Sequence, residues 1–453
     1  MLKVKTKLIA SAIALAFAAS SAVAAVSQAE ADKLGTTLTP MGAEKAGNGG
    51  AIPAWDGGLT TPPAGFKVGD KPVNPFPNDK VKFTITAKNY KEYAANLTDG
   101  QKAMFEKYPD TYVMPVYETR RTSAYPQKIY DITKKNAVSS KAIGDSGLEN
   151  FVEGVPFPIP KSGVEAIWNH ITRYRGGSVS RVVGQATPQP NGDYSIVRLQ
   201  DEFTFAPYLT DFDASRDANI LFYFKQDVLS PARLAGNVLL VHETIDQVKE
   251  PRKAWVYNAG QRRVRLAPQV SYDGPGTASD GMRTSDNLDM YNGAPDRYDW
   301  KLVGKQEVYI PYNSYKLKDP ALKYDDIVKA GHINQDLTRY ELHRVWKVEA
   351  TLKEGKRHIY AKRTFYLDED TWQATEIDHY DGRGELWRVA EAHNLMYYDN
   401  LVPWYAVETL YDLSSGRYLV LGLDNEEKSS YEWNFKRSSG DYTPNALRRG
   451  GVR

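Results

Sequence analysis

The chain has 453 residues, with 58 basic and 56 acidic side chains, no cysteine and an aromatic content of 12%. This near balance of charge argues against nucleic acid or anionic lipid as the main partner, because both require a strongly basic surface. The absence of cysteine excludes disulfides and a lipid-modified cysteine. Its 30 tyrosines and nine tryptophans suit half-exposed sheet faces and surfaces that line a ligand site.

The N-terminus has the three-part pattern of a secretory signal peptide. Three lysines precede an apolar run from Leu8 to Phe17, and small residues end in Ala22-Val23-Ala24. The apolar run is only about half of the roughly 20 residues that a membrane-spanning helix needs. We therefore predict that residues 1–24 are removed. The mature chain is predicted to be periplasmic, with peripheral attachment to the outer membrane as an alternative.

Residues 25–82 are rich in proline and glycine and lack an apolar periodicity. Such a segment cannot build a core of its own, so it is either disordered or laid over a folded body. Trp55 and Phe66 favour an extended N-terminal arm, because an aromatic side chain in a polar segment usually has a surface to contact.

Two helical regions are predicted, near residues 87–107 and 163–175. In the first, Thr98 and Gln101 have the spacing of a capping box. In the second, another capping box begins at Ser162, an apolar stripe follows at helical spacing, and a Gly-Gly pair ends the helix. The stripe predicts that this helix packs on a sheet.

Most of the remaining chain has the pattern of antiparallel strands. Short runs rich in Val, Ile, Tyr, Phe and Trp alternate with turns of Pro, Gly, Asn and Asp in residues 178–205, 219–270 and 340–423. In the last of these stretches, apolar side chains alternate with Lys, Arg, Glu and Asp. We therefore expect its sheet to be solvated on one face.

Residues 271–300 form a long loop without periodicity, and a loop of this length is usually functional or disordered. We expect it to order independently of the sheet. Its four closely spaced aspartates suggest calcium, but Leu288 and Met290 stand where oxygen ligands would be needed. A structural or lid-like role is favoured over a metal site.

Four histidines lie on the predicted C-terminal strands and could form a metal or acid–base cluster if they faced the same side. They are His343, His358, His379 and His393. Strand parity supports this arrangement only in part, so surface or singly paired histidines remain the simpler interpretation. No nucleophile motif or zinc-protease motif is present. The sequence therefore predicts no catalytic residue, no metal ligand, no cofactor and no enzymatic activity.

Several long runs carry a resemblance to a known family. They include LTPMGAEKAGN, LTDGQKAMFEKYPDTYVMPVYETRR, GVPFPIPKSGVEAIWNH and LDMYNGAPDRYDWKLVGKQEVYIPYN, and the likeness extends over nearly all the mature chain. The chain resembles domain-of-unknown-function family 1329 of Gram-negative bacteria, which is similar in its sheet to the LolA and LolB lipoprotein-sorting proteins. The resemblance implies an open antiparallel half-barrel over helices with a lipid-sized cavity. It also implies a genetic association with outer-membrane barrel proteins and with exporters of the resistance-nodulation-division type.

The combined prediction is an α+β protein with one large, curved antiparallel sheet wrapped over a few helices. The half-barrel domain is placed at residues 83–425, and a polar C-terminal tail at residues 426–453. The predicted function is non-catalytic binding or shuttling of a hydrophobic or lipid-like molecule. The alternatives are an adaptor that docks on an outer-membrane channel or exporter, and a periplasmic enzyme acting on a hydrophobic substrate.

Aromatic side chains on the predicted helix and strands are the candidates for the ligand site, because apolar ligands are held in cavities lined by such groups. The candidate ligand-binding residues are Trp168, Trp255, Tyr257, Trp346, Trp372 and Trp387.

Overall fold

The computed structural model describes residues 26–267, 270, 272–428 and 431–450. The predicted signal peptide, residues 1–24, lies outside this part of the chain. Among the helices of the described residues, none has both the length and the apolar character of a membrane span.

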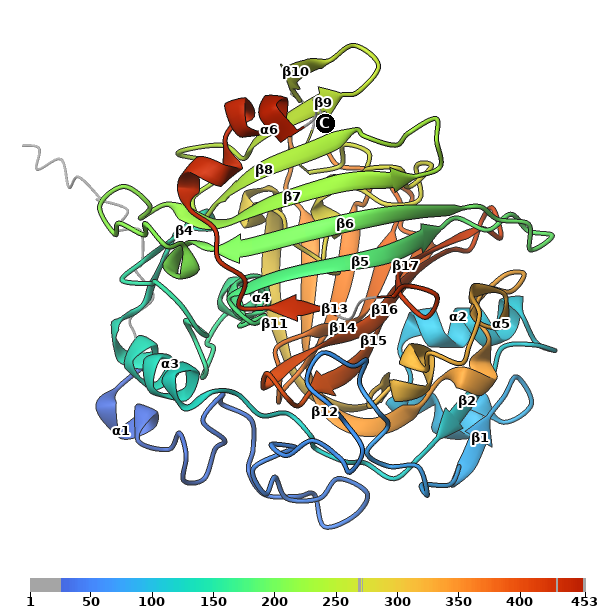
Figure 1. Cartoon of the computed structure of the whole chain (residues 1–453). Coiled ribbons are helices and arrows are strands. Elements are labelled where there is room, and N and C mark those ends of the chain that lie inside the picture. Colours follow the sequence, from blue (N-terminus) through green and yellow to red (C-terminus); the bar gives the residue numbers. More distant parts are fainter. Residues whose placement is uncertain (1–25, 268–269, 271, 429–430, 451–453) are drawn as a thin grey trace, which may run out of the picture.

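A sixteen-stranded sheet dominates the fold (Figure 1). Its first half, from one edge inward, consists of β10 (Arg263–Leu266), β9 (Lys253–Asn258), β8 (Val238–Thr244), β7 (Ile220–Ser230), β6 (Ile196–Phe205) and β5 (Ser178–Ala186). The second half continues with β17 (Tyr418–Leu423), β16 (Val402–Asp412), β15 (Leu386–Tyr397), β14 (Ala374–Tyr380), β13 (Lys362–Asp368), β12 (Tyr340–Leu352), β2 (Met114–Val116) and β1 (Phe83–Ile85).

Four further strands complete the β-structure. β11 (Tyr298–Pro311) pairs with β12, and β18 (Glu432–Trp433) pairs with β5. The strands β3 (Lys141–Ile143) and β4 (Gly147–Glu149) form a separate hairpin. The pairings are antiparallel apart from a single bridge between Tyr340 and Val116. Because β1 and β10 lie at opposite ends of the strand order, the sheet stays open, which confirms the predicted α+β class with a curved antiparallel sheet.

The sheet bends sharply between its two halves. Figure 1 shows β5–β8 crossing in front of β13–β16, so that the halves face each other. At the junction, the pairing of β17 with β5 shifts register between Leu421 and Leu423, and such a bulge bends a strand. Gly422 lies at this shift with φ of 105°, and a Cβ atom there would come within 2.7 Å of the carbonyl oxygen of Ala406. The close approach and the positive φ both require glycine.

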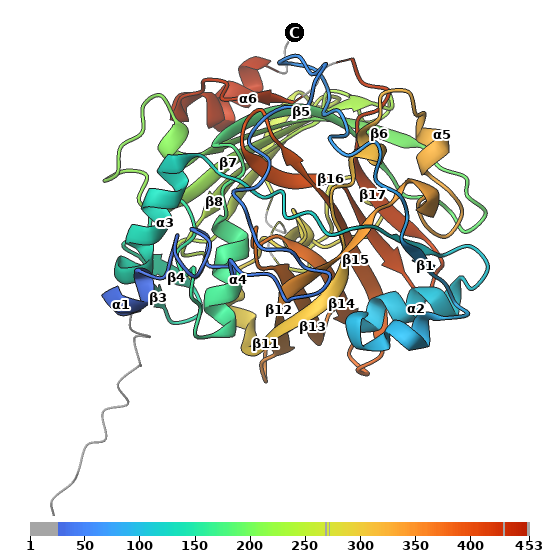
Figure 2. The same ribbon diagram turned by 90° about the horizontal axis from the view of Figure 1, so that it is seen from below.

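Six α-helices are described: α1 (Gln28–Ala31), α2 (Asp99–Lys107), α3 (Gln127–Ser139), α4 (Gly163–Thr172), α5 (Tyr324–Ile327) and α6 (Pro444–Gly450). Short 3₁₀ turns lie at η1 (Tyr90–Asn96), η2 (Ala206–Tyr208), η3 (Ser285–Asn287), η4 (Pro295–Arg297), η5 (Tyr315–Lys318), η6 (Gln335–Leu337) and η7 (Ser439–Tyr442). Both bonds of the capping box that begins at Thr98 are formed, and Ser162 caps α4. Figure 2 shows α4 on the inner side of the bend.

The second half of the sheet is buried on both faces, so the prediction of one solvated face is wrong. Nearly every residue of β13–β17 is buried. On the face away from α4, the backbone N–H of Gly100 in α2 donates to Asp378 at 2.9 Å, and Gln101 donates to Glu376 at 3.0 Å. The charged residues of these strands therefore find partners in segments that come from distant parts of the sequence.

The N-terminal and C-terminal segments both dock on the sheet domain. In the arm, Trp55 donates to the carbonyl of Ser123 at 3.0 Å, and Phe66 packs edge-on against Tyr398. At the other end, α6 contacts β8, β9 and β10, and Tyr442 and Leu447 are buried there. The sequence beyond residue 426 is polar on average, but these two side chains pack into a cluster on the outer face of the first half of the sheet.

Candidate functional site

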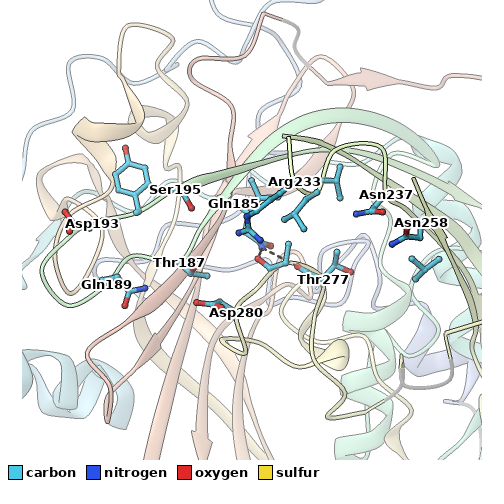
Figure 3. Close-up of a pocket in the computed structure, with 16 residues that line it drawn as sticks. Gln185, Thr187, Gln189, Asp193, Ser195, Arg233, Asn237, Asn258, Thr277 and Asp280 are labelled. Carbon is cyan, nitrogen blue, oxygen red and sulfur yellow. Dashed lines mark hydrogen bonds between the residues drawn. The ribbon is translucent and has the colours of Figure 1, made fainter. Parts of the chain in front are cut away.

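Two cavities lie between the inner face of the first half of the sheet and residues 272–297, which we call the covering segment. The outer cavity has a volume of about 640 Å³ and opens near the ends of β5–β9 (Figure 3). Its lining combines apolar side chains with many polar ones. The lining includes Gln185, Val197, Val228, Arg233, Val256 and Thr277.

The inner cavity is smaller, at about 70 Å³, and lies further along the same strands. Its walls include Phe222 and Phe224 of β7, Leu239 and Val241 of β8, and Leu288 of the covering segment. In β7 the inward-facing positions 222, 224 and 226 line the inner cavity, and the next inward position, 228, lines the outer one. Thr277 lines both cavities, so they are neighbours, and we call the two together the hollow beneath the sheet.

Buried ion pairs hold the covering segment in place. The Asp289 carboxylate accepts two hydrogen bonds from Arg173, which follows α4, and a third from Arg175. The Asp286 carboxylate accepts from Arg363 of β13 at 2.6 Å and lies 3.1 Å from His358. The segment also contributes apolar side chains to the core, namely Met282, Met290 and Tyr291. The sequence predicted that this loop orders independently, because no periodic apolar face was found to hold it against the sheet. The buried contacts of the covering segment contradict that reason.

These surroundings shift the pKa values of the buried acids in opposite directions. Burial alone would raise the pKa of Asp289, but the guanidinium groups of Arg173 and Arg175 outweigh burial and lower it. Burial and the Asp289 charge together raise the pKa of Glu408 in β16 to about 8. Burial lowers the pKa of His170 in α4 to about 3, and the Arg173 charge adds to this effect. At neutral pH, Asp289 is therefore ionised, whereas Glu408 and His170 are largely uncharged.

The six aromatic residues predicted to bind a ligand do not come together at these cavities. Trp168 and Trp372 are fully buried in the main core, and Trp346 stacks on Trp372 with ring centroids 6.2 Å apart. Trp387 is half-buried, packs against Tyr360 and donates to Asp412. None of these side chains is among the residues that line the two cavities.

Trp255 and Tyr257 face away from the hollow. On β9 the inward positions are Val256 and Asn258, which line the outer cavity. Because successive side chains of a strand point to opposite faces, Trp255 and Tyr257 lie on the outer face, where they join the cluster of Tyr442 and Leu447. Sequence alternation identified one face of the strand, but it could not show which face is concave. Ligand contact by the six aromatic residues stays a prediction.

The four histidines predicted to lie on the C-terminal strands do not form one cluster, and His358 lies in the loop between β12 and β13 rather than on a strand. His358 and His379 both pack against Tyr360, whereas His343 stacks on Tyr312 and His393 packs near Tyr340. Within the described residues, His343, Asp368 and Asp370 place one possible ligand atom each within 4.8 Å of one another. However, Asp370 accepts two hydrogen bonds from Arg121, at 2.9 and 2.6 Å, so a guanidinium already neutralises this carboxylate.

Sequence reasoning missed the polar residues of the hollow. Arg283 and Gln226 line the inner cavity, and Gln185 of β5 lines the outer one, where it donates to the carbonyls of Thr277 and Ala278. The sequence of the covering segment could have indicated that it is buried, because Met282 and Met290 are too apolar for a solvated loop. Reading them as core residues would have placed Arg283 inside the fold.

Comparison with known proteins gives relatives in sequence and in structure. The uncharacterized protein PA3922 of Pseudomonas aeruginosa is 66% identical over 443 residues, which cover 97% of each chain. A crystal structure of a DUF1329 family protein from Desulfovibrio piger matches with a TM-score of 0.42 and 15% identity, over 60% of this chain and 92% of that one. A LolA superfamily protein from Nitrosomonas europaea matches with a TM-score of 0.38 and 12% identity, over 63% of this chain and all of that one.

The family described as "Protein of unknown function (DUF1329)" matches residues 84–448, which include the whole of the large sheet from β2 onward and the covering segment. With this match and the closely similar Pseudomonas sequence, the chain belongs to the DUF1329 family.

Proposed function

We propose that the protein binds a hydrophobic or amphipathic molecule non-catalytically and shuttles it between components of the Gram-negative envelope. The observation that carries this proposal is the hollow beneath β5–β9, with apolar side chains such as Phe222 and Phe224 in its inner cavity and a larger outer cavity. Small-molecule sites are typically concave and apolar, with a few placed polar groups. The mixed lining favours an amphipathic ligand over a purely apolar one.

The N-terminal sequence supports a periplasmic location, because its lysines, apolar run and small-residue motif form an export signal. A soluble carrier that crosses an aqueous compartment has to shield the apolar part of its ligand from water, and the covering segment closes one side of the hollow. An outer-membrane channel or exporter would be the natural donor or acceptor for such a carrier.

The test uses protein purified without detergent. Bound small molecules are extracted and identified by mass spectrometry, and binding of a fluorescent fatty-acid probe is then measured for the parent protein and two variants. Val256→Trp places a large ring in the outer cavity and is expected to abolish probe binding. Leu266→Trp, on the exposed neighbouring strand, is the matched control and should bind the probe like the parent.

No copurified ligand together with no probe binding by the parent protein would rule out the carrier function. Equal binding by the parent and by Val256→Trp would place the ligand somewhere other than this hollow.

A further inference from the structure

Arg283 is a buried cation without a hydrogen-bond or ion-pair partner among the described residues. Its side chain extends from the covering segment into the wall of the inner cavity and is 7% exposed. The Nε and Nη1 atoms are buried and make no hydrogen bond. Across the described part of the chain, no hydrogen bond or ion pair joins this guanidinium to another residue.

The neighbouring buried arginines differ from Arg283 in this respect, because each has a carboxylate close by. The pairs are Arg173–Asp289 at 2.7 Å, Arg181–Asp201 at 3.3 Å, Arg252–Glu243 at 2.8 Å, Arg363–Asp286 at 2.6 Å and Arg388–Asp412 at 3.0 Å. Burying a charge without a partner is strongly unfavourable. Each of these arginines has a carboxylate to balance its charge, whereas Arg283 has none within ion-pair distance among the described residues.

Glu408 does not supply the missing charge. Its carboxyl is the leading electrostatic influence on Arg283 after burial, yet no hydrogen bond links the two groups. Burial and the nearby Asp289 charge keep the pKa of Glu408 at about 8, so the carboxyl stays mostly protonated at neutral pH. Glu408 therefore gives Arg283 no ion pair at neutral pH.

The surroundings of Arg283 combine apolar side chains with polar ones, among them the ion-paired Arg252 and Glu243. Phe222, Phe224, Leu239 and Val241 form the sheet side of the cavity. The outer cavity of about 640 Å³ also borders Thr277, and its lining includes the apolar side chains of Val228 and Val256. A cation without a carboxylate of its own, beside these apolar side chains and the ion-paired Arg252 and Glu243, matches a molecule that joins one anionic group to an apolar body.

We propose that Arg283 binds the anionic head group, a carboxylate or a phosphate monoester, of an amphipathic ligand whose apolar body lies along the inner face of β7 and β8. A guanidinium suits both groups because it donates in parallel to two oxygens. Gln226, whose Oε1 atom is buried and unpartnered while its amide donates to Asp201 at 2.8 Å, can accept from a protonated head group. This inference rests on the proposed binding function and specifies its ligand class.

The test is titration calorimetry with five probes: decanoate, decyl phosphate, decanol, acetate and inorganic phosphate. The parent protein is expected to bind decanoate or decyl phosphate at least tenfold more tightly than decanol. In Arg283→Met, binding of the anionic amphiphiles should weaken about ten- to hundredfold, the loss expected for charge-assisted hydrogen bonds, while decanol binding stays unchanged. Arg383→Gln, which removes a highly exposed cation outside both cavities, is the control and should behave like the parent.

The outcomes separate this inference from the function on which it rests. If decanol and decanoate bind the parent equally, the protein is a carrier but Arg283 is not a head-group site. If acetate or inorganic phosphate binds as tightly as decanoate, the site takes a small anion and the amphipathic ligand is wrong. If the parent binds no probe, both proposals fail. If Arg283→Met does not fold, two other measurements decide whether Arg283 binds the head group. The parent should prefer decanoate over decanol, and Arg283→Lys should retain part of that preference.

Discussion

The Asp289 carboxylate accepts hydrogen bonds from Nη2 of Arg173 on both of its oxygens, at 2.7 and 2.8 Å. The two residues are separated by 116 positions in the sequence, and both are almost completely buried. This contact fixes the covering segment to the end of α4 and thereby sets the floor of the hollow beneath the sheet.

Replacing Asp289 should destabilise the fold strongly. In Asp289→Ala, Arg173 and Arg175 lose their carboxylate and remain buried as unpaired charges, which costs about 3–5 kcal/mol. Urea unfolding monitored by tryptophan fluorescence measures the loss. Asp381→Ala removes the partner of a highly exposed arginine, Arg383, and should leave the unfolding midpoint nearly unchanged. Similar midpoints for the two variants would show that the covering segment is not held by this pair.

Hydrogen exchange should find the covering segment protected. The backbone N–H groups of Met282 and Asn292 donate to carbonyls at 2.8 Å, and both residues are buried. Slow exchange depends on such bonds being shielded from water. These amides should therefore exchange about as slowly as those of β7. Exchange as fast as at the exposed Gly384 turn would restore the sequence-based expectation of an independently ordered loop.

The stability of the protein should fall as the pH rises from 5 to 8, and Glu408 should account for part of this slope. Its folded pKa of about 8 lies above the unfolded value near 4.5. The stabilising contribution is therefore complete below pH 4.5 and is lost as the pH approaches 8. Glu408→Gln should reduce the slope by up to about 1 kcal/mol per pH unit in urea titrations at pH 5, 6, 7 and 8. An identical slope in both proteins would contradict the assignment.

Two tryptophans test the sequence-based ligand site against the structure. Trp372 is completely buried, so Trp372→Ala should cost about 3–5 kcal/mol of unfolding free energy. Trp255 is half-buried on the outer face beside His242, so Trp255→Ala should cost less and loosen the contact with α6. Neither change should alter binding of the fatty-acid probe by the folded protein. A large loss of binding in Trp255→Ala at unchanged stability would support the sequence-based assignment.

The exported protein should begin at Ala25 and carry no lipid. The small-residue motif ending at Ala24 sets the expected cleavage site, and the absence of cysteine removes the usual site of lipid attachment. Intact-mass measurement of the periplasmic fraction checks both statements together. A mass that still contains residues 8–17 would show that the segment is retained.

The sequence by itself determined the local elements of this protein. The spacing of Thr98 and Gln101 produces a capping box because both of its hydrogen bonds lie within one helical turn. The alternating runs of β7 and β8 form strands for a similar reason, since their period of two follows from the backbone geometry of each strand alone. The antiparallel class also followed from the sequence, because short turns between successive runs leave little room for parallel crossovers.

Only the tertiary structure decided which side chains face the hollow. Trp255 and Val256 are adjacent in the sequence and equally compatible with either face, but the bend of the sheet makes the Val256 side concave. The tertiary structure also decided which charged side chains pair with each other. The covering segment has no periodic signal, and its aspartates find their partners across more than 70 residues, at Arg173 and Arg363. Local patterning cannot encode such pairings, because their energies depend on burial and on contacts that exist only once the sheet has closed over the segment.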